Sequence, residues 1–502
     1  MEYDVVVIGS GVGGGCVALT LADTGARVLM LERGERLRRE PQNWDAEAVF
    51  VDQRYRAHET WYDGDGVPFR PGQFYYVGGH TKFFGTAMFR FRERDFEALE
   101  HEEGVSPPWP IRYADLEPWY AQAEKLFGVH GKVGDDPTEP PRSGPYPFPP
   151  IPHEPAMDEL AQVFRGIGLK PFYMPSSISL HPGGRCVRCR TCDAFPCRID
   201  AKGDAEICLV DPALKRPNVT LQTGSLVTRL IADEAGKRIV AAEVKRGSET
   251  QRIHARLFVL AAGAINSAVV LLRSVDSKHP HGLANSSGLV GRYFMNHNCT
   301  ALMALKPSRV NHTHFPKTVT LNDFYFGGDA SNKPLGNLQP LGKILEPMLR
   351  GALPHTPKLL RRQLARHSSD WYVMSEDLPD ADSRVMLRSD GAIELRWLRT
   401  NLRAHRRFVR VAKALLKEAG FPIVLSKPFG SDTPSHQCGT VRFGDDPATA
   451  PLDTYCRAYD HDNLYVVDAS FFPSCAALNP ALTVAAQALR VGDHLKTRLH
   501  QF

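Results

Sequence analysis

The stretch Tyr3-Asp4-Val5-Val6-Val7-Ile8-Gly9-Ser10-Gly11-Val12-Gly13-Gly14-Gly15 decides the fold. Residues Val5 to Ile8 form a continuous β-branched run, which is typical of a strand that is buried on both faces. Gly9, Gly11 and Gly14 then match the G-x-G-x-x-G pattern. In that pattern the first glycine allows a tight turn, the second admits a pyrophosphate, and the third lets a helix pack closely on the strand. The stretch therefore predicts the start of a dinucleotide-binding βαβ unit.

The next residues complete this unit. We expect a helix over residues 16–24 that ends at Gly25, and a second strand over residues 27–31 that ends at Glu32. Glu32 follows the glycines by about twenty residues, where a carboxylate accepts hydrogen bonds from the ribose hydroxyls of a nucleotide. A glycine-rich turn in a βαβ unit that binds no nucleotide is the alternative. The full series of strand, glycines, helix, strand and acid favours the nucleotide.

Composition and charge narrow the class of protein. With 502 residues, 43% of them hydrophobic and 23% charged, the chain can form two domains with a substantial core. A net charge of +5, without a basic tract interleaved with aromatic residues, gives no indication of a nucleic-acid partner. No apolar run approaches about eighteen residues, and the first strand begins too early for a signal peptide. We therefore expect no membrane span and a cytoplasmic location.

Four further segments, together with the N-terminal unit, resemble the glucose–methanol–choline (GMC) oxidoreductase family. Residues 77–85 (VGGHTKFFG) are similar to its glycine-rich loop beside the flavin, and residues 258–267 (FVLAAGAINS) to the strand and turn that return to the nucleotide domain. Residues 435–440 (SHQCGT) are similar to the segment with the family's catalytic histidine. Residues 464–470 and 478–483 resemble its C-terminal strand and helix start. The nearest resemblance is to the subgroup with a His/Asn pair, which includes pyranose oxidases, bacterial glycoside 3-oxidases and cholesterol oxidases.

This resemblance implies an α/β fold in which a discontinuous, Rossmann-like FAD-binding domain is joined to an α+β substrate domain with an antiparallel sheet. It assigns residues 1–95, 201–299 and 456–502 to the FAD-binding domain, and residues 96–200 and 300–455 to the substrate domain. The predicted cofactor-binding residues are Gly9, Gly11, Val12, Gly13, Gly14, Glu32, Arg33, Gly78, Gly79, Thr81, Lys82, Val227, Ala262, Asp468 and Pro480.

His80 raises the question of a covalent bond to FAD, because some relatives attach FAD through a histidine of this loop. In those relatives the histidine lies several residues further from the glycine pair, where this chain has residues 82–84. We therefore expect FAD to be bound without a covalent link.

His436 and Asn479 are the predicted catalytic residues. Oxidising an alcohol requires a base that removes the hydroxyl proton while a hydride leaves the same carbon, and the pKa of histidine suits that role. His436 lies in a polar, glycine-containing loop, and a structural histidine is the alternative. Asn479 precedes Pro480 at the start of a helix expected to reach about residue 496. Its amide can bind the substrate oxygen, and a helix N-cap is its simpler role.

A group of four cysteines allows a metal site. Cys186, Cys189, Cys192 and Cys197 have a spacing close to that of ferredoxins, so an iron–sulfur cluster or a zinc ion is one interpretation. Some membrane-bound relatives in the resembled family carry an iron–sulfur cluster in the corresponding region. Surface thiols or a disulfide pair, set among arginines, are the alternatives.

The predicted substrate domain contains a hairpin, with strands at 385–387 and 393–397, and a helix over 401–419 with one apolar face. Residues 347–369 lack acidic side chains and predict a short basic amphipathic helix. That helix could cover the active site, contact a subunit or a membrane, or be a plain exposed segment. Gln339 and Trp371 flank the segment and are the predicted sugar contacts.

The leading hypothesis is an FAD-dependent enzyme that oxidises a secondary hydroxyl of a sugar, glycoside or cyclitol to a ketone, with oxygen or another electron acceptor as its second substrate. Within the same class, the alternatives are a dehydrogenase that reduces a quinone or cytochrome, and an enzyme for a sterol-like alcohol. A non-catalytic flavoprotein subunit is the alternative from another class, and the presence of both His436 and Asn479 argues against it.

Overall fold

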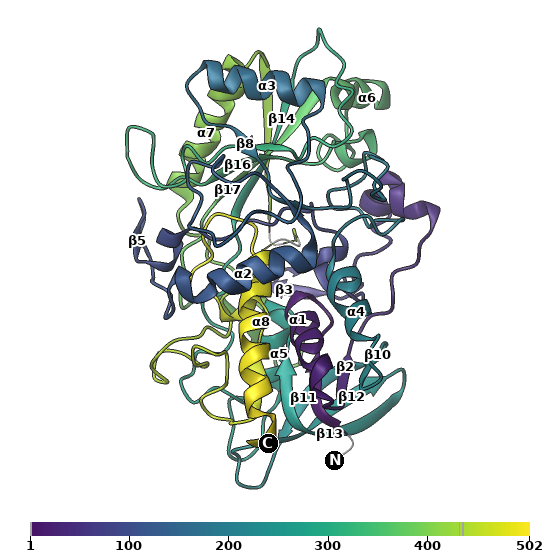
Figure 1. The fold of residues 1–502 in the computed structure, drawn as a ribbon, viewed down its shortest axis with the longest axis vertical. Helices are drawn as coiled ribbons and strands as arrows, with labels where there is room; N and C mark the ends of the chain where they lie inside the picture. The colour runs from purple at the N-terminus through teal and green to yellow at the C-terminus, as the bar shows by residue number, and fades with distance from the viewer. Residues whose placement is uncertain (1–2, 431, 434–435, 502) are drawn as a thin grey trace.

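The computed structural model describes residues 3–430, 432–433 and 436–501. Two parts follow one another along the long axis of the molecule (Figure 1). The lower part contains both chain termini and a large sheet with helices beside it. The upper part contains a second, smaller sheet covered by helices.

The lower sheet has seven strands. In spatial order these are β10 (Val219–Gln222), β2 (Val28–Leu31), β1 (Tyr3–Ile8), β13 (Glu249–Leu260), β12 (Ile239–Arg246) and β11 (Leu226–Ala232), with β21 (Leu464–Val466) paired to β13. The strands β10, β2, β1, β13 and β21 pair in parallel, while β11 and β12 extend the sheet as antiparallel neighbours. Parallel strands with both faces covered need continuous apolar runs, and Val5, Val6 and Val7 of β1 are fully buried.

The helix that follows β1 begins earlier than the sequence pattern predicts. Helix α1 covers Val12–Leu21 and therefore includes Gly13, Gly14 and Gly15, and a 3-10 turn at Ala22–Thr24 leads to Gly25. The glycines permit this early start because they let α1 approach neighbouring backbone closely. A Cβ atom on Gly13 would lie 2.1 Å from the Val467 carbonyl oxygen, and one on Gly14 would lie 2.0 Å from that of Gly9. At the other end, Gly25 has a left-handed φ of 76°, which agrees with its predicted role of ending the helix.

Further helices complete the lower part. They are α2 (Tyr113–Phe127), α4 (Asp211–Ala213), α5 (Ala264–Arg273) and α8 (Ala481–Arg498). The C-terminal helix α8 packs directly on α1, since a Cβ atom on Gly492 would lie 2.9 Å from the Cβ atom of Thr20. The two ends of the chain therefore stabilise the same layer, where Figure 1 shows α1 in purple beside α8 in yellow.

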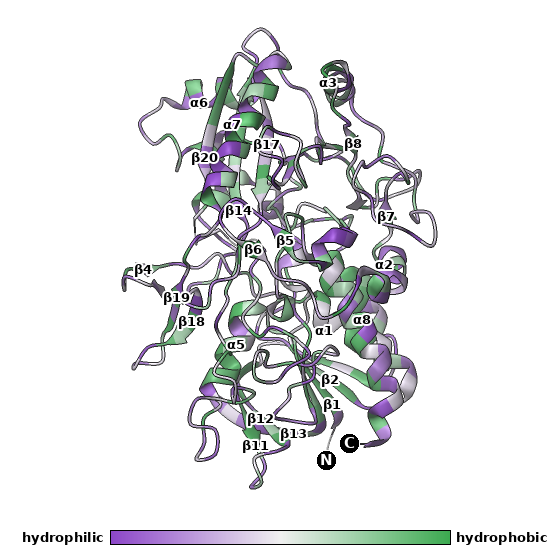
Figure 2. Ribbon diagram, turned by 90° about the vertical axis from the view of Figure 1, so that its left-hand side faces the viewer, coloured by the Kyte–Doolittle hydropathy of each residue, from purple (hydrophilic) through white to green (hydrophobic). Residues whose placement is uncertain are grey.

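The upper sheet has four antiparallel strands: β16 (Asn337–Pro340), β17 (Ser368–Ser375), β14 (Asn298–Leu305) and β20 (Ile423–Pro428). One face packs against α3 (Pro155–Gly166) and α7 (Leu402–Glu418) in a core that contains Trp371, Phe164 and Phe408. Figure 2 shows both hydrophobic and hydrophilic residues on α7, as expected for a helix with only one buried face. The other face of the sheet is left to line a cavity.

The predicted hairpin is present as β18 (Arg384–Leu387) and β19 (Ile393–Arg396), and the basic segment forms helix α6 (Lys358–His367). Short strands fill the connections: β3 (Trp61–Asp63), β4 (Pro68–Phe69), β5 (Leu99–Glu100), β6 (Val105–Ser106), β7 (Val129–His130), β8 (Phe172–Tyr173), β9 (Ser176–Ser177) and β15 (Val319–Thr320). Within the described ranges, no helix has the length and apolar character needed to span a membrane. The residue boundaries of the two domains stay a prediction.

Candidate active site

A cavity of about 1280 Å³ is lined by residues of both parts of the molecule. One end is formed by the glycine turn after β1, together with Glu32 and Arg33. The other end is formed by the open face of the upper sheet and by His436 and Asn479. The predicted nucleotide-binding and catalytic residues therefore meet in one cavity, although the sequence separates them by more than four hundred positions.

The glycine turn has the shape that a pyrophosphate requires. Gly9 has a φ of 103°, and a Cβ atom there would lie 2.2 Å from the Ala261 carbonyl oxygen. A Cβ atom on Gly11 would meet nothing within 4 Å, because this position faces the open cavity. Helix α1 starts at Val12, and the N–H groups and the positive dipole end of a helix favour a phosphate. The residues present therefore fit a dinucleotide cofactor.

Glu32 follows β2 and lies at the edge of this turn. Its Oε2 accepts hydrogen bonds from the Ser10 hydroxyl (2.6 Å) and the Ser10 N–H (3.1 Å), and its Oε1 accepts one from the Gly34 N–H (2.8 Å). Burial raises the pKa of the Glu32 carboxyl against the lowering effect of these bonds. Arg33 pairs with Glu59 and lies over the ring of Tyr75, with 3.6 Å between the guanidinium carbon and the ring centroid.

Most of the other predicted cofactor residues also line the cavity. They are Val12, Gly13, Gly78, Gly79, Thr81, Val227, Ala262, Asp468 and Pro480. Asp468 joins the C-terminal segment to the turn after β13, because it accepts hydrogen bonds from the Gly263 N–H (3.0 Å) and from the Ser267 hydroxyl. The strands β13 and β21 therefore present their C-terminal ends to the cavity together.

Two predicted cofactor residues, Lys82 and Gly14, do not line the cavity. Lys82 is buried, and its Nζ lies 2.6 Å from Glu206 Oε2 and 3.0 Å from Asp204 Oδ2. The prediction that Lys82 contacts the cofactor is therefore wrong, because its charge serves an internal ion pair. Gly14 packs against Gly9 and has the helix-packing role that the pattern assigns to the third glycine.

His436 and Asn479 lie side by side at the catalytic end. The Asn479 Nδ2 atom is 3.3 Å from His436 Nε2, and Asn479 Oδ1 accepts a hydrogen bond of 2.9 Å from Gln339 Nε2. His436 has a left-handed φ of 62°. The N-cap of α8 is Pro480, so the N-cap role considered for Asn479 is wrong, and its amide is engaged with the histidine and Gln339 instead. Ser435, which opens the histidine motif, lies outside the described residues.

His297 is a residue of this end that the sequence did not single out. Its Nδ1 lies 2.8 Å from His436 Nδ1, and its Nε2 lies 3.0 Å from the Cys475 carbonyl oxygen and 2.9 Å from that of Ala476. The pairing of Met295 with Cys438 explains the contact, because it places 297 opposite 436 in an antiparallel register. Only knowledge of that long-range pairing would have revealed His297.

Burial lowers the pKa of His436 well below its ordinary value, and the neighbouring His297 and Lys317 lower it further. The pKa of His297 shifts the other way. Burial lowers it, but Cys475 and nearby Glu376 outweigh that effect and raise it above the ordinary value. A neutral His436 beside a more basic His297 is an arrangement that suits general-base chemistry at His436.

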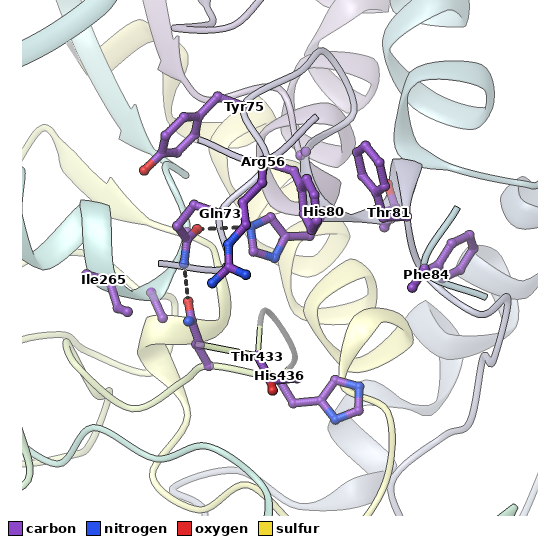
Figure 3. A pocket seen from close by; sticks show the side chains of 18 of the residues that line it. Arg56, Gln73, Tyr75, His80, Thr81, Phe84, Ile265, Thr433 and His436 are labelled. Carbon is purple, nitrogen blue, oxygen red and sulfur yellow. Dashed lines mark hydrogen bonds between the residues drawn. The ribbon is translucent and has the colours of Figure 1, made fainter. Parts of the chain in front are cut away.

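His80 lies on the opposite side of the cavity from His436. Gln73 connects the two loops, because its Oε1 lies 2.9 Å from His80 Nε2 and its Nε2 donates to Gln437 Oε1 at 2.9 Å. Figure 3 shows Gln73 between His80 and the segment that carries Thr433 and His436. The glycine-rich loop and the catalytic loop are thus connected through the uncharged polar side chains of Gln73 and Gln437.

Trp371 does not contact the cavity. It is fully buried in the core beneath α3, with its ring 5.7 Å from that of Phe164. Successive side chains of a strand point to opposite faces, so its neighbour Tyr372 lines the cavity instead. Gln339, which is paired with Tyr372 across the sheet, also lines it. The prediction is therefore wrong for Trp371, and Tyr372 and its ring neighbour Phe429 are aromatic residues of this wall.

The cysteine group forms no metal site in this structure. Cys186, Cys189, Cys192 and Cys197 are all free and partly exposed. In the part of the chain that is described, no three His, Cys, Asp or Glu side chains converge as metal ligands do. The four thiols are close enough for Cys192 to interact electrostatically with the other three, but the described geometry does not arrange them as metal ligands, so the iron–sulfur or zinc interpretation is not supported.

Comparison with known proteins agrees with the geometry. The family described as GMC oxidoreductase matches residues 69–299 and 379–488, and an FAD binding domain matches residues 4–43. The chain is 32% identical to paromamine 6'-oxidase of Streptomyces fradiae, over 97% of this chain and 90% of the relative. It is also 32% identical to 6'''-hydroxyparomomycin C oxidase of Streptomyces lividus, over 99% and 92% of the two chains. Fructose dehydrogenase large subunit of Gluconobacter japonicus is 26% identical, over 100% and 99%.

Two solved structures share the fold. Pyridoxine 4-oxidase from Mesorbium loti has a TM-score of 0.66 at 18% identity and covers 98% of this chain and 99% of its own. Formate oxidase of Aspergillus oryzae has a TM-score of 0.69 at 16% identity, over 99% and 98%. The predicted fold class is thereby confirmed, whereas the narrower resemblance to pyranose oxidases and glycoside 3-oxidases is not specifically supported. The chain therefore belongs to the GMC oxidoreductase family and is an FAD-dependent oxidoreductase that acts on CH–OH groups.

Proposed function

We propose that this enzyme oxidises a hydroxyl of an uncharged sugar, glycoside or cyclitol. The observation that carries the proposal is the convergence of a base, an amide and an unsatisfied amide oxygen at one end of the cavity. These groups belong to His436, Asn479 and Gln339, all of which line the cavity. A substrate with several neighbouring hydroxyls can bind to all three.

The proposed reaction divides between two side chains. His436 Nε2 takes the proton of the reacting hydroxyl, while Asn479 Nδ2, 3.3 Å from that nitrogen, donates a hydrogen bond to the same oxygen. Bound FAD supplies the acceptor for the hydride that leaves the carbon. The residues proposed to hold FAD are the glycines after β1, Glu32, and the cavity-lining residues around Gly78 and Asp468.

Gln339 supports a substrate with a second donor close to the reacting hydroxyl. The residue is fully buried, and its Nε2 donates to Asn337 Oδ1 and Asn479 Oδ1, each at 2.9 Å. Its Oε1 has no hydrogen-bond partner among the described residues. Because Gln339 is fully buried, we propose that its side chain rotates toward the cavity when a substrate hydroxyl binds, which removes the cost of the unpaired acceptor.

The charges around the catalytic end favour a neutral substrate. Lys317 Nζ pairs with Asp193 Oδ2 at 3.0 Å, and both residues line the cavity. Lys427 and Asp432, which also line it, add one charge of each sign. Arg56 also lines the cavity and donates to the Asp432 carbonyl oxygen at 2.9 Å, so this wall carries a small excess of positive charge, which suits a neutral sugar or cyclitol better than a polycation.

The names of the relatives offer a second view of which hydroxyl of the substrate is oxidised. The sequence favours a secondary ring hydroxyl and a ketone product, while the names of the two Streptomyces relatives refer to 6' and 6''' positions. An anaerobic panel of neutral glycosides, cyclitols, aminoglycosides, sterols and monohydric alcohols tests the proposal through the loss of flavin absorbance. We expect the fastest bleaching with a neutral polyol, and the carbonyl product identifies the oxidised carbon. Bleaching by a sterol or a monohydric alcohol alone would contradict the proposed substrate class.

The relatives leave two kinds of electron acceptor to distinguish, because they include two oxidases and a fructose dehydrogenase large subunit. We propose that oxygen is the acceptor, as the names of the more similar relatives suggest. The reduced enzyme is then expected to recover its flavin absorbance in air with release of peroxide. Recovery that requires an added quinone or cytochrome would show a dehydrogenase instead.

Gln339 is expected to discriminate between a substrate and its analogue that lacks the neighbouring hydroxyl. Leaving Gln339 Oε1 unpaired should cost about 1–3 kcal/mol, which corresponds to about a 5- to 150-fold loss of kcat/KM for the deoxy analogue. The Gln339→Leu variant should lower kcat/KM for the parent substrate and largely remove the difference between the two compounds. Steady-state kinetics of both proteins with both compounds measure this coupling.

Trp371→Phe is the control for that experiment. Trp371 neighbours the same wall but faces the opposite core, so its variant should preserve the discrimination between parent and deoxy substrate. Equal discrimination by Gln339→Leu and the native enzyme would exclude Gln339 from substrate recognition.

FAD is expected to leave the protein on acid denaturation. His80 Nε2 is engaged with Gln73, and the residue is not at the position where relatives form a covalent link. After precipitation in acid, we expect the flavin absorbance in the supernatant. Flavin that stays with the washed pellet would contradict non-covalent binding.

A further inference from the structure

The contact between His297 and His436 can contain only one proton. Their Nδ1 atoms are 2.8 Å apart, so one of the two nitrogens donates and the other accepts. The Nε2 atom of His297 faces the carbonyl oxygens of Cys475 and Ala476, which are pure acceptors. His297 Nε2 therefore carries a hydrogen, whatever the state of the rest of the pair.

These contacts fix the form of His436 when the pair holds no extra proton. A neutral His297 with its hydrogen on Nε2 presents a lone pair at Nδ1. His436 must then donate its own Nδ1–H to that lone pair, which leaves the lone pair of His436 on Nε2. Asn479 Nδ2 faces this nitrogen, as expected for an amide donor opposite an acceptor. The basic lone pair on His436 Nε2 therefore points into the cavity.

We propose that His297 is a positioning residue that fixes the tautomer of His436 and receives the proton that His436 takes from the substrate. This proposal rests on the function proposed above. The substrate O–H proton moves to His436 Nε2, and the Nδ1 proton of His436 moves to His297 Nδ1. The electron pair of the substrate C–H bond leaves with the hydride to the FAD acceptor, so the substrate becomes a carbonyl compound. The positive charge then rests on His297.

The groups around the two histidines favour a positive charge on His297 over one on His436. The carboxylate of Glu376 and the carbonyl oxygen of Cys475 favour a positive charge on the almost fully buried His297. Burial raises the pKa of the Cys475 thiol well above its ordinary value, so this thiol is uncharged beside the pair. Lys317 instead acts on His436, where it disfavours a positive charge. The titratable or charged groups packed around the pair are Lys317, Glu376, Asp377, Cys438 and Cys475.

The arrangement predicts a distinctive pH dependence. When His297 is already protonated, its Nδ1–H is donated to His436, whose remaining hydrogen lies on Nε2, so no base faces the substrate. Because the pKa of His297 is raised above 6.5, the FAD-reduction rate of the native enzyme should fall as the pH decreases through a value above 6.5. Without a titratable residue at 297, that decline should depend on His436 alone, whose pKa lies well below 6.5.

Two variants separate the role of His297 in fixing the tautomer of His436 from its role in receiving the proton. In His297→Gln, the amide can still donate to the carbonyl oxygens and accept from His436, but it cannot receive a proton. We expect its acid decline to move below pH 6.5, with substrate affinity preserved. His297→Leu lacks the acceptor as well, so its FAD-reduction rate should fall at least ~10-fold even at high pH, which is part of the contribution of a positioned base. Rapid-mixing measurements of FAD reduction from pH 5 to 9 give both quantities.

His405→Gln is the matched control, because His405 is also a buried histidine beside the upper sheet. Its Nε2 lies 2.8 Å from Thr300 Oγ1 and its Nδ1 lies 3.0 Å from Ser375 Oγ, and it does not line the cavity. We expect this variant to retain the native pH profile. Thermal unfolding and FAD content of each variant show that it is folded, and if His297→Leu fails to fold, His297→Gln alone decides.

The outcomes also separate this inference from the proposed function. A native acid decline in His297→Gln would overturn the proton-accepting role of His297, and a native rate in His297→Leu would overturn its role in fixing the tautomer, while either result leaves His436 as the base. A His436→Gln variant that reduces FAD at the native rate would instead remove the base itself. A position-297 effect on substrate affinity alone, with no change in the pH profile, would also overturn the inference.

Discussion

Replacing His436 with glutamine is expected to lower the rate of FAD reduction by at least ~10²-fold, because a positioned general base contributes about 10² to 10⁴ in rate. The variant loses the one nitrogen that faces both the cavity and Asn479 Nδ2. Its effect should appear in the rate of the chemical step more than in substrate affinity, since Gln339 and the cavity wall remain. Anaerobic rapid mixing of the FAD-loaded variant with substrate measures the two separately.

The control for this variant is its FAD content. His436 belongs to the catalytic end of the cavity, where it contacts His297 and Asn479 rather than the glycine turn after β1, so we expect His436→Gln to bind FAD at the native ratio. A variant with full FAD content and a rate within a few-fold of the native enzyme would exclude His436 as the base.

Replacing Gly13 with alanine is the second change with a large expected effect. The new Cβ atom would lie 2.1 Å from the Val467 carbonyl oxygen and 2.9 Å from the Val467 carbonyl carbon. Both atoms belong to the backbone that connects β21 to Asp468, so the clash cannot be relieved by a side-chain rotation. We expect the free energy of unfolding to fall by at least about 1–3 kcal/mol, as for other overpacked positions, and FAD to be lost during purification.

Gly11→Ala provides the comparison, because its Cβ atom would meet nothing within 4 Å in this structure. We expect this protein, stripped of FAD, to unfold at the same urea concentration as the native chain. Its affinity for FAD should nevertheless fall, since the methyl group points into the cavity where the pyrophosphate is proposed to bind. Equal unfolding of Gly13→Ala and the native chain would contradict the account of the close approach between α1 and β21.

The N-terminal unit could be predicted closely because its physics is local. The β-branched run, the glycines and Glu32 lie within consecutive residues, and each has one structural role. Strand β1 (Tyr3–Ile8) contains the predicted run Val5–Ile8, whereas α1 begins at Val12 because glycines that look like a turn are tolerated inside a closely packed helix. Residues Gly78 and Asp468 were located through similarity to a family and not through local pattern.

The errors have physical causes that the sequence does not display. The sequence predicts a sugar contact at Trp371, but the register of β17 with its partner strands turns Trp371 into the core and Tyr372 toward the cavity. Lys82 was assigned to the cofactor because its two carboxylate partners, Asp204 and Glu206, are more than a hundred positions away. His297 was missed for a related reason, since its contact with His436 arises from one long-range pairing.

The most direct test of the central claim is a single anaerobic turnover. The FAD-loaded enzyme is mixed with an excess of the neutral polyol that bleaches it fastest, with and without deuterium at the carbon that carries the reacting hydroxyl. The account predicts one carbonyl product for each FAD reduced, a slower reaction with the deuterated substrate, and at least ~10²-fold slower bleaching in His436→Gln. Bleaching without a carbonyl product, or at the same rate in His436→Gln, would contradict it.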